Sequence, residues 1–140
     1  MRNLSILPAI VIATLLITSC SKTDMNILSI SEAESIIPGS YKVNDFANGD
    51  GDFTQFENYT FQFNSNGSIT ATKGDETFTG TWDIRTTNTD PVYDKEVSIT
   101  LAGNTEVEDL SHVWYVKEVT DVTLDLIEET IASEVLFIKI

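Results

Sequence analysis

The sequence predicts an all-β domain: an eight-stranded antiparallel up-and-down barrel that follows a short N-terminal helical turn. From Gly39 onward, apolar and polar residues alternate with a period of two, which is the pattern of strands with one buried face. Turn-forming pairs such as Asn66-Gly67 and Asp90-Pro91 separate eight such segments. The length of 140 residues also suits one domain with a single hydrophobic core.

The helical turn is predicted at residues 31–37. Ser31 and Glu34 have the spacing of a capping box, in which a Ser and a Glu side chain satisfy free backbone N–H groups at the start of a helix. Pro38-Gly39 follows this segment, and that pair is typical of a helix end.

The first four strands are predicted at residues 41–45, 59–63, 69–71 and 78–84. In the second strand, Tyr59, Phe61 and Phe63 share one face. Residues 64–67 (Asn-Ser-Asn-Gly) join it to the third strand as a hairpin, because Asn and Gly tolerate the positive φ that such turns require.

The last four strands are predicted at residues 97–101, 114–117, 122–126 and 135–140, with polar loops at 86–95 and 102–109. The final strand is apolar on both faces except at Lys139. Assigning Lys139 to the outer face places Leu136, Ile138 and Ile140 inward and Phe137 outward. Closure into a barrel removes the exposed sheet edges that invite aggregation.

The first twenty residues have the pattern of an export signal. Met1-Arg2-Asn3 is a short positive region, and residues 4–17 form an apolar stretch that is too short for a membrane-spanning helix. The following segment, Leu16-Ile17-Thr18-Ser19-Cys20, resembles a lipobox. We therefore predict a signal peptide at 1–19, a lipidated Cys20 with a tether at 20–30, and a barrel domain at 31–140.

This anchor predicts a location in the cell envelope. Ser21 after the Cys is compatible with sorting to the outer membrane, with the domain facing either the periplasm or the cell surface. Cys20 is the only Cys, so an intramolecular disulfide is excluded.

The charge of the chain limits its partners. It has 22 acidic and eight basic side chains, a formal net charge of −14, and removal of the signal takes away one further base, Arg2. A domain this acidic repels nucleic acid, which we do not expect as a partner.

Three segments carry a resemblance to a known family: Gly39-Ser40-Tyr41, the run Phe61-Gln62-Phe63-Asn64-Ser65-Asn66-Gly67, and Gly80-Thr81-Trp82. With them, the chain resembles the lipocalin-like domains of bacterial lipoproteins. The resemblance implies a barrel open at one end with an apolar ligand cavity. Two departures stand out. Tyr41 replaces the usual Trp of the first strand, and the Arg that packs over that Trp from the last strand has no counterpart, because Arg85 is the only Arg after the signal.

The candidate ligand-binding residues are the aromatic side chains predicted to face inward. They are Tyr59, Phe61, Phe63, Phe78, Trp82 and Trp114. They either line a pocket for a small apolar ligand or simply fill the core, because the interior of an eight-stranded barrel is just wide enough for one or the other.

Other polar groups offer weaker candidate sites. Residues 45–52 resemble a Ca²⁺ loop in composition, but Phe53 and Glu57 are out of register with an EF-hand, which favours a solvated turn. His112 is the only His and is predicted to lie at the surface. We find no spacing typical of a nucleophile with its base, nor a set of metal ligands, and therefore expect neither catalysis nor a cofactor.

Two functions stay open from the sequence. The first is a membrane-anchored binding module for a small apolar ligand. The second is a filled barrel that docks another envelope protein through its outer face or loops.

Overall fold

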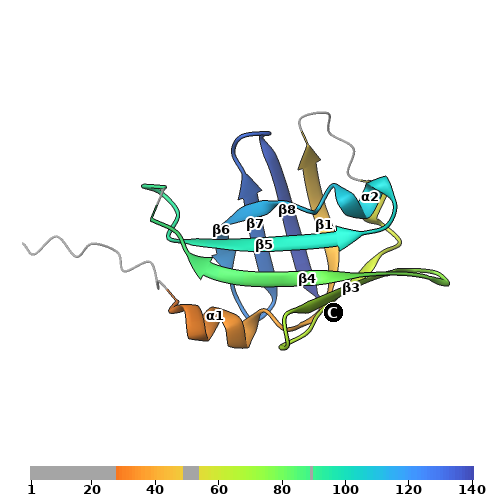
Figure 1. Ribbon diagram of the computed structural model, residues 1–140, viewed down its shortest axis with the longest axis horizontal. Helices are drawn as coiled ribbons and strands as arrows, with labels where there is room; N and C mark the ends of the chain where they lie inside the picture. The colour runs from red at the N-terminus through yellow and green to blue at the C-terminus, as the bar shows by residue number, and fades with distance from the viewer. Residues whose placement is uncertain (1–27, 49–53, 89) are drawn as a thin grey trace, which may run out of the picture.

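The computed structural model describes residues 28–48, 54–88 and 90–140. Over these ranges the chain forms a closed barrel of eight antiparallel strands, in which each strand pairs with the next and β8 returns to pair with β1 (Figure 1). The predicted fold class is therefore confirmed, and the architecture fits a lipocalin-like barrel. The predicted signal, Cys20 and most of the tether lie outside the described residues.

The strands are β1 (Gly39–Asn48), β2 (Thr60–Phe63), β3 (Ser68–Lys73), β4 (Glu76–Thr86), β5 (Lys95–Ala102), β6 (Val113–Val119), β7 (Thr123–Glu128) and β8 (Ser133–Lys139). The described helices are α1 (Ile30–Ile36), α2 (Thr105–Glu108) and a 3₁₀ turn at Thr54–Phe56. No helix in the described ranges is both long and apolar enough to cross a membrane.

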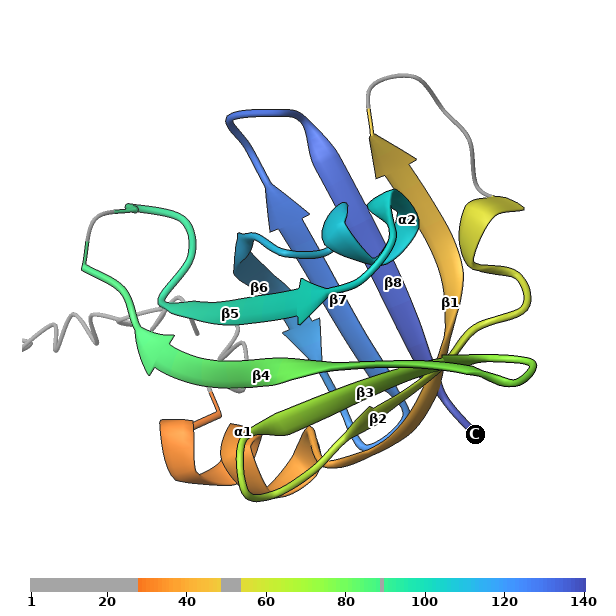
Figure 2. The same cartoon turned by 45° about the vertical axis from the view of Figure 1, so that its right-hand side comes forward.

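The barrel has two different ends, which Figure 2 separates clearly. We call one the α1 end; it carries α1, the β2–β3 turn at 64–67 and the β6–β7 turn at 120–122. We call the other the mouth; it carries the β3–β4 turn at 74–75, the β5–β6 connection with α2, and the β7–β8 turn at 129–132.

Helix α1 begins one residue earlier than predicted, and its N-cap lies two residues before the predicted one. Ser29 is the N-cap, and its side chain and that of Glu32 form the capping box, so the predicted pair Ser31 and Glu34 was wrong. The earlier start includes Ile30 in the helix and places it on the same face as the buried Ala33. The sequence contains two Ser-x-x-Glu patterns, at 29–32 and at 31–34, and burial of this face against the barrel distinguishes them.

The orientation of β8 is the reverse of the prediction. Val135 and Phe137 are fully buried, whereas Ile140 is exposed. Lys139 lies on the inner face with Phe137, but it is the last residue of β8, at the α1 end. There its ammonium donates a hydrogen bond to the Ile36 carbonyl of α1 at 2.7 Å. An inward Lys is therefore satisfied at the end of the barrel, which the alternation pattern does not reveal.

Two smaller predictions also need correction. Val122 was assigned to the seventh strand, but β7 begins at Thr123 and Val122 is exposed in the preceding turn. The predicted loop at 102–109 contains α2, whose N-cap Asn104 accepts a hydrogen bond from the Val107 backbone N–H. Residues 45–48 of the candidate Ca²⁺ segment belong to β1, and residues 49–52 lie outside the described ranges.

Candidate functional site

The predicted ligand-binding aromatics lie inside the barrel and pack on one another. Tyr59, Phe61, Phe63 and Trp114 are fully buried, Trp82 nearly so, and Phe78 is partly buried. The Tyr59 ring stacks on that of Phe61 at 5.7 Å between centroids, and the Phe63 ring meets that of Trp82 edge-on, also at 5.7 Å.

Four further aromatic residues complete this packing. They are Tyr41, Phe46, Phe56 and Phe137, all essentially buried. Phe137 packs against two of the predicted rings: its ring centroid lies 5.5 Å from those of Phe61 and Phe63. The sequence pattern missed it because β8 was given the wrong orientation. Ring against ring at these distances is the packing of a filled core, so the barrel axis is occupied by the protein's own side chains.

The polar atoms of the buried rings are satisfied by the backbone. The Tyr41 hydroxyl donates to the Ile37 carbonyl at 2.7 Å, and burial raises the pKa of Tyr41 to about 12. The indole N–H of Trp82 donates to the Asn64 carbonyl at 2.9 Å, and that of Trp114 to the Leu110 carbonyl at 3.0 Å. These three donors are therefore satisfied within the protein and need no ligand in the barrel axis as a hydrogen-bond partner.

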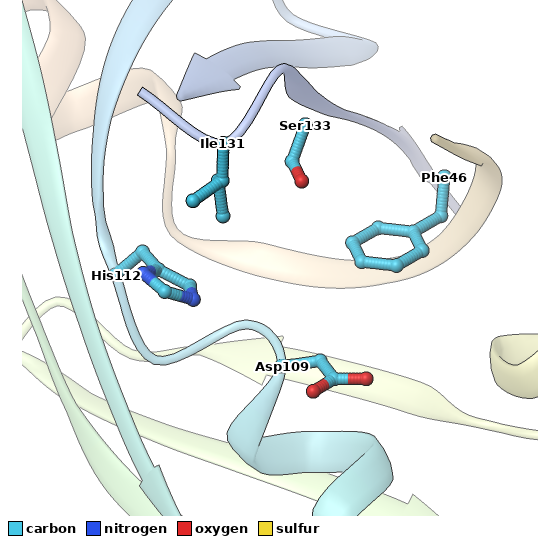
Figure 3. Close-up of a pocket in the computed structure, with 5 residues that line it drawn as sticks. All are labelled: Phe46, Asp109, His112, Ile131 and Ser133. Carbon is cyan, nitrogen blue, oxygen red and sulfur yellow. The ribbon is translucent and has the colours of Figure 1, made fainter. Parts of the chain in front are cut away.

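A pocket of about 210 Å³ lies at the mouth (Figure 3). We call it the mouth pocket; its lining residues are Phe46, Asp109, His112, Ile131 and Ser133. They come from four places in the chain: β1, the segment after α2, the β7–β8 turn and the first position of β8. Barrel closure brings them together, because β8 pairs with β1.

Ser133 is the most unusual residue of the mouth pocket. It is 2 % exposed, and its hydroxyl points into the pocket in Figure 3. Within the described ranges, the Ser133 hydroxyl has no hydrogen-bond partner. A buried polar group without a partner costs about 1–3 kcal/mol, so such a group in a pocket marks a place where a ligand would restore the missing hydrogen bond.

The turn before Ser133 is strained. Ala132 has φ of 51°, in the left-handed region that residues with a side chain rarely adopt. This turn places Ile131 and Ser133 on the same pocket, one supplying apolar surface and the other a hydroxyl. Strain of this kind recurs at functional sites, where the surrounding structure enforces it.

His112 and Asp109 supply the other polar groups of the mouth pocket. The His112 imidazole meets the Trp114 ring edge-on at 5.8 Å, and Asp109 accepts a hydrogen bond through Oδ2 from the Gln55 side chain at 3.3 Å. Ser, His and Asp are the residue types of a catalytic triad. Among the described residues, however, no hydrogen bond joins any two of these three, as it does in a triad.

A polar cluster holds α2 on the barrel and so places Asp109 and His112. Glu106 accepts hydrogen bonds from the Tyr59 hydroxyl and the Lys73 ammonium, both at 2.7 Å. These two donors, Lys73 first, lower the pKa of Glu106. Glu106 lies in the loop predicted at 102–109, although Asn104 followed by acidic residues is a recognisable helix start.

A second hollow, of about 340 Å³, lies at the α1 end. Its lining combines Trp82 and Ile84 with polar residues of α1, β4 and the β2–β3 turn. Of the six predicted aromatics, Trp82 is the one that lines it. In the described part of the chain, no group of three or more His, Cys, Asp or Glu residues could hold a metal ion.

Comparison with known proteins gives little beyond the fold. No family model and no curated protein matches the chain. Among solved structures, the chain is similar to the crystal structure of a DUF4847 family protein from Bacteroides vulgatus, with 18 % sequence identity and a TM-score of 0.49. The match covers 75 % of this chain and 94 % of that chain. This similarity is too low to assign a family.

Proposed function

We propose that this protein is a lipid-anchored binding module of the cell envelope that holds a small ligand at the mouth of its barrel. The observation that carries this proposal is the buried Ser133 hydroxyl, which faces the mouth pocket and has no partner among the described residues. A protein that folds with such a group gains a hydrogen bond when a ligand binds, whereas a purely structural barrel gains nothing from it.

The site proposed here differs from the cavity that the family resemblance implies. The barrel axis is filled by packed rings, so an apolar ligand has no space there without displacing them. At the mouth, Phe46 and Ile131 still offer apolar surface. The ligand then contacts the end of the aromatic core instead of entering it.

The described chain enters the barrel at the α1 end, opposite the proposed site. The described chain begins at Leu28, beside α1, and the predicted lipidated Cys20 precedes it by eight residues. Attachment through the α1 end leaves the mouth accessible to solutes. Metabolic labelling with an alkyne fatty acid tests the anchor: label is expected on the wild-type chain and absent from Cys20→Ser. Equal labelling of both would contradict it.

The binding proposal is tested by blocking the mouth pocket without disturbing the core. Ile131 is 48 % exposed, so Ile131→Trp fills the pocket from a surface position. Val122→Trp is a matched control, because Val122 is 53 % exposed in a turn at the α1 end. The full-length chain is incubated with a small-molecule extract of the cells that produce it and examined by native mass spectrometry. We expect adducts on the wild type and on Val122→Trp, and their loss from Ile131→Trp.

A second candidate function is a module that docks another envelope protein. The filled core is compatible with this function, because a barrel without an axial cavity can act as a rigid scaffold for a partner. It leaves the Ser133 hydroxyl unexplained, and for that reason we place it second. Absence of adducts from the wild type as well as from both Trp variants would favour docking.

A further inference from the structure

We propose that the last part of strand β4 is a docking edge, to which an extended basic segment of another protein adds as a further strand. This surface lies at the α1 end, beside the second hollow, and is independent of the mouth pocket. It gives the docking function, our second candidate above, a defined place on the chain.

Strand β4 extends beyond its neighbour β3. The two strands pair only from Glu76 to Thr81 of β4, whereas the pairing of β4 with β5 continues to Thr86. Figure 2 shows this offset: toward its arrowhead β4 runs beside β5, with α1 below it. We call residues 82–86 of β4 the open edge, because among the described residues no strand pairs with them on the side away from β5. At a rise of about 3.3 Å per residue, the open edge is about 13 Å long.

Two hydrogen bonds show which backbone groups face the open side. The Trp82 N–H donates to a carbonyl of the β2–β3 turn at 2.8 Å, away from β5. The Thr87 N–H donates to the Asp94 carbonyl at 3.0 Å, on the β5 side. Because backbone groups alternate between the two sides of a strand, those of Ile84 and Thr86 point away from β5. Within the described ranges, neither residue has a hydrogen-bond partner on that side.

Burial makes the unpaired backbone of Ile84 informative. Ile84 is 4 % exposed, so water has little access to its N–H and C=O groups. Backbone groups buried to this extent are almost always paired, because an unpaired one has lost its water and gained nothing in return. Helix α1 packs against β4, but no hydrogen bond joins the described backbones of the two elements. The partner that matches a row of free N–H and C=O groups is another extended chain.

The second hollow provides space for such a chain beside the open edge. It measures about 340 Å³, and its lining includes Trp82 and Ile84 of the open edge and the turn residues 65–67. In an added strand, every second side chain would lie over the apolar surface of Trp82 and Ile84, and the others would face solvent. Backbone pairing then supplies affinity, and the apolar surface favours small apolar residues at alternate positions of the segment.

The charges around the hollow favour a basic segment. Glu34 of α1 and Asp83 of β4 line it; both are exposed, and neither has an ion-pair partner among the described residues. Arg85, the next outward residue of β4, is already paired with Glu96 of β5. Together with the formal charge of −14, these acids attract a segment that carries Lys between its apolar positions and repel an acidic one. The acids need not share one cation, because the site itself is formed by the backbone.

Hydrogen exchange of single amides tests whether the edge is open. In the full-length chain, NMR compares Ile84 and Thr86 with Asp83 and Arg85, whose N–H groups face β5 in the same strand. We expect the amides of Ile84 and Thr86 to exchange at least about tenfold faster than the other two in the free chain. Equal protection of all four amides would mean that the edge is already covered, by this chain or by a second copy, and would overturn the proposal.

Three peptides with blocked ends then test the occupant. The first is a heptapeptide of alternating Lys and Val, the second carries a methyl group on each internal backbone nitrogen, and the third has Glu in place of Lys. We expect the first peptide to slow exchange at Ile84 and Thr86 by about tenfold and to leave Asp83 and Arg85 unchanged. N-methylation removes the backbone donors and keeps the side chains, so equal protection by the second peptide would show that the edge does not pair with it.

A charge reversal tests the preference for a basic segment. Asp83→Lys should weaken binding of the Lys-Val peptide about tenfold, measured by titration calorimetry at low ionic strength. Asp75→Lys is the matched control, because Asp75 is exposed in the β3–β4 turn at the mouth. Equal weakening in both variants, or equal binding of the Glu peptide, overturns the assignment of a basic partner. Failure of the Lys-Val peptide to bind the wild type overturns the docking edge, and neither result bears on the adduct experiment at the mouth pocket.

Discussion

The ammonium of Lys139 lies over the ring of Tyr41, 5.4 Å from its centroid. Lys139 also donates a hydrogen bond to the Ile36 carbonyl at the C-terminal end of α1. A Lys of the last strand and a Tyr of the first thus form a cation–π contact that also ties α1 to the barrel.

We predict that Lys139→Met weakens the attachment of α1. The substitution removes a cation–π contact and a hydrogen bond to a helix carbonyl, while Met retains most of the apolar stem. We expect the free energy of unfolding to fall by about 1–2 kcal/mol, measured by urea denaturation. Lys42→Met is the control, because Lys42 is exposed on β1. An equal loss in both variants would show that the contact with Tyr41 and α1 contributes nothing.

We predict that Ser133→Ala stabilises the protein while it impairs binding at the mouth. The substitution removes a buried hydroxyl that lacks a partner among the described residues, so the free energy of unfolding should rise by about 1 kcal/mol. Ser111→Ala is a contrasting control, since the Ser111 hydroxyl donates to the Leu101 carbonyl and accepts from the Leu101 N–H. Ser111→Ala should destabilise. A loss of stability in Ser133→Ala would mean that its hydroxyl is satisfied in solution.

We predict that stability falls at alkaline pH as Tyr41 ionises. Burial raises its pKa from 10.0 to about 12, so the folded state favours the neutral phenol. The resulting contribution is complete below pH 10 and is lost as the pH rises from about 10 to about 12, a change of about 2–3 kcal/mol.

Tyr41→Phe should reduce this loss of stability at alkaline pH. Tyr115→Phe, on the outer face of β6, should leave it unchanged. Urea denaturation across the alkaline range, with tyrosinate absorbance followed in parallel, measures both effects. An unchanged loss in Tyr41→Phe would assign the pH dependence to another group, of which Tyr59 is the first candidate, since burial raises its pKa as well.

We predict that α2 loosens at acidic pH. Hydrogen bonds from Lys73 and Tyr59 lower the pKa of Glu106 below 4.5, so this contribution to stability is present above that pH and is lost as the pH falls further. Hydrogen exchange of residues 103–112 should therefore accelerate at low pH relative to the strands. At neutral pH, Glu106→Gln should reproduce part of the effect. Glu108→Gln, at an exposed neighbouring position, should exchange like the wild type; if both variants match the wild type, Glu106 does not hold α2.

Much of the barrel could be predicted from local pattern alone. In β2 and β5 the apolar residues alternate strictly, and the structure buries the residues that the pattern assigned inward. The turn at 64–67 forms where Asn and Gly predicted it, with Gly67 at φ of 80°. These features are decided within a few residues, because strand alternation and turn geometry are properties of the local backbone.

The orientation of β8 and the start of α1 could not be predicted in this way. Residues 135–138 are apolar on both faces, so alternation contains no information about which face is buried. The prediction therefore depended on Lys139 alone, which was assigned to the outer face. It was wrong because Lys139 is satisfied by an α1 carbonyl that lies 103 residues away in the chain. Likewise, Ser29 and Ser31 both fit a capping box, and only the packing of Ile30 and Ala33 against the barrel distinguishes them.

The sequence by itself determined that the chain alternates as strands, that its turns lie where Asn, Gly and Pro cluster, and that its charge is strongly acidic. The tertiary structure decided that the aromatic side chains fill the barrel and that the candidate site lies at the mouth. Its residues, from Phe46 to Ser133, are distant in sequence and become neighbours only when β8 closes the barrel against β1. No local pattern encodes that closure, since it depends on the register of every strand between them.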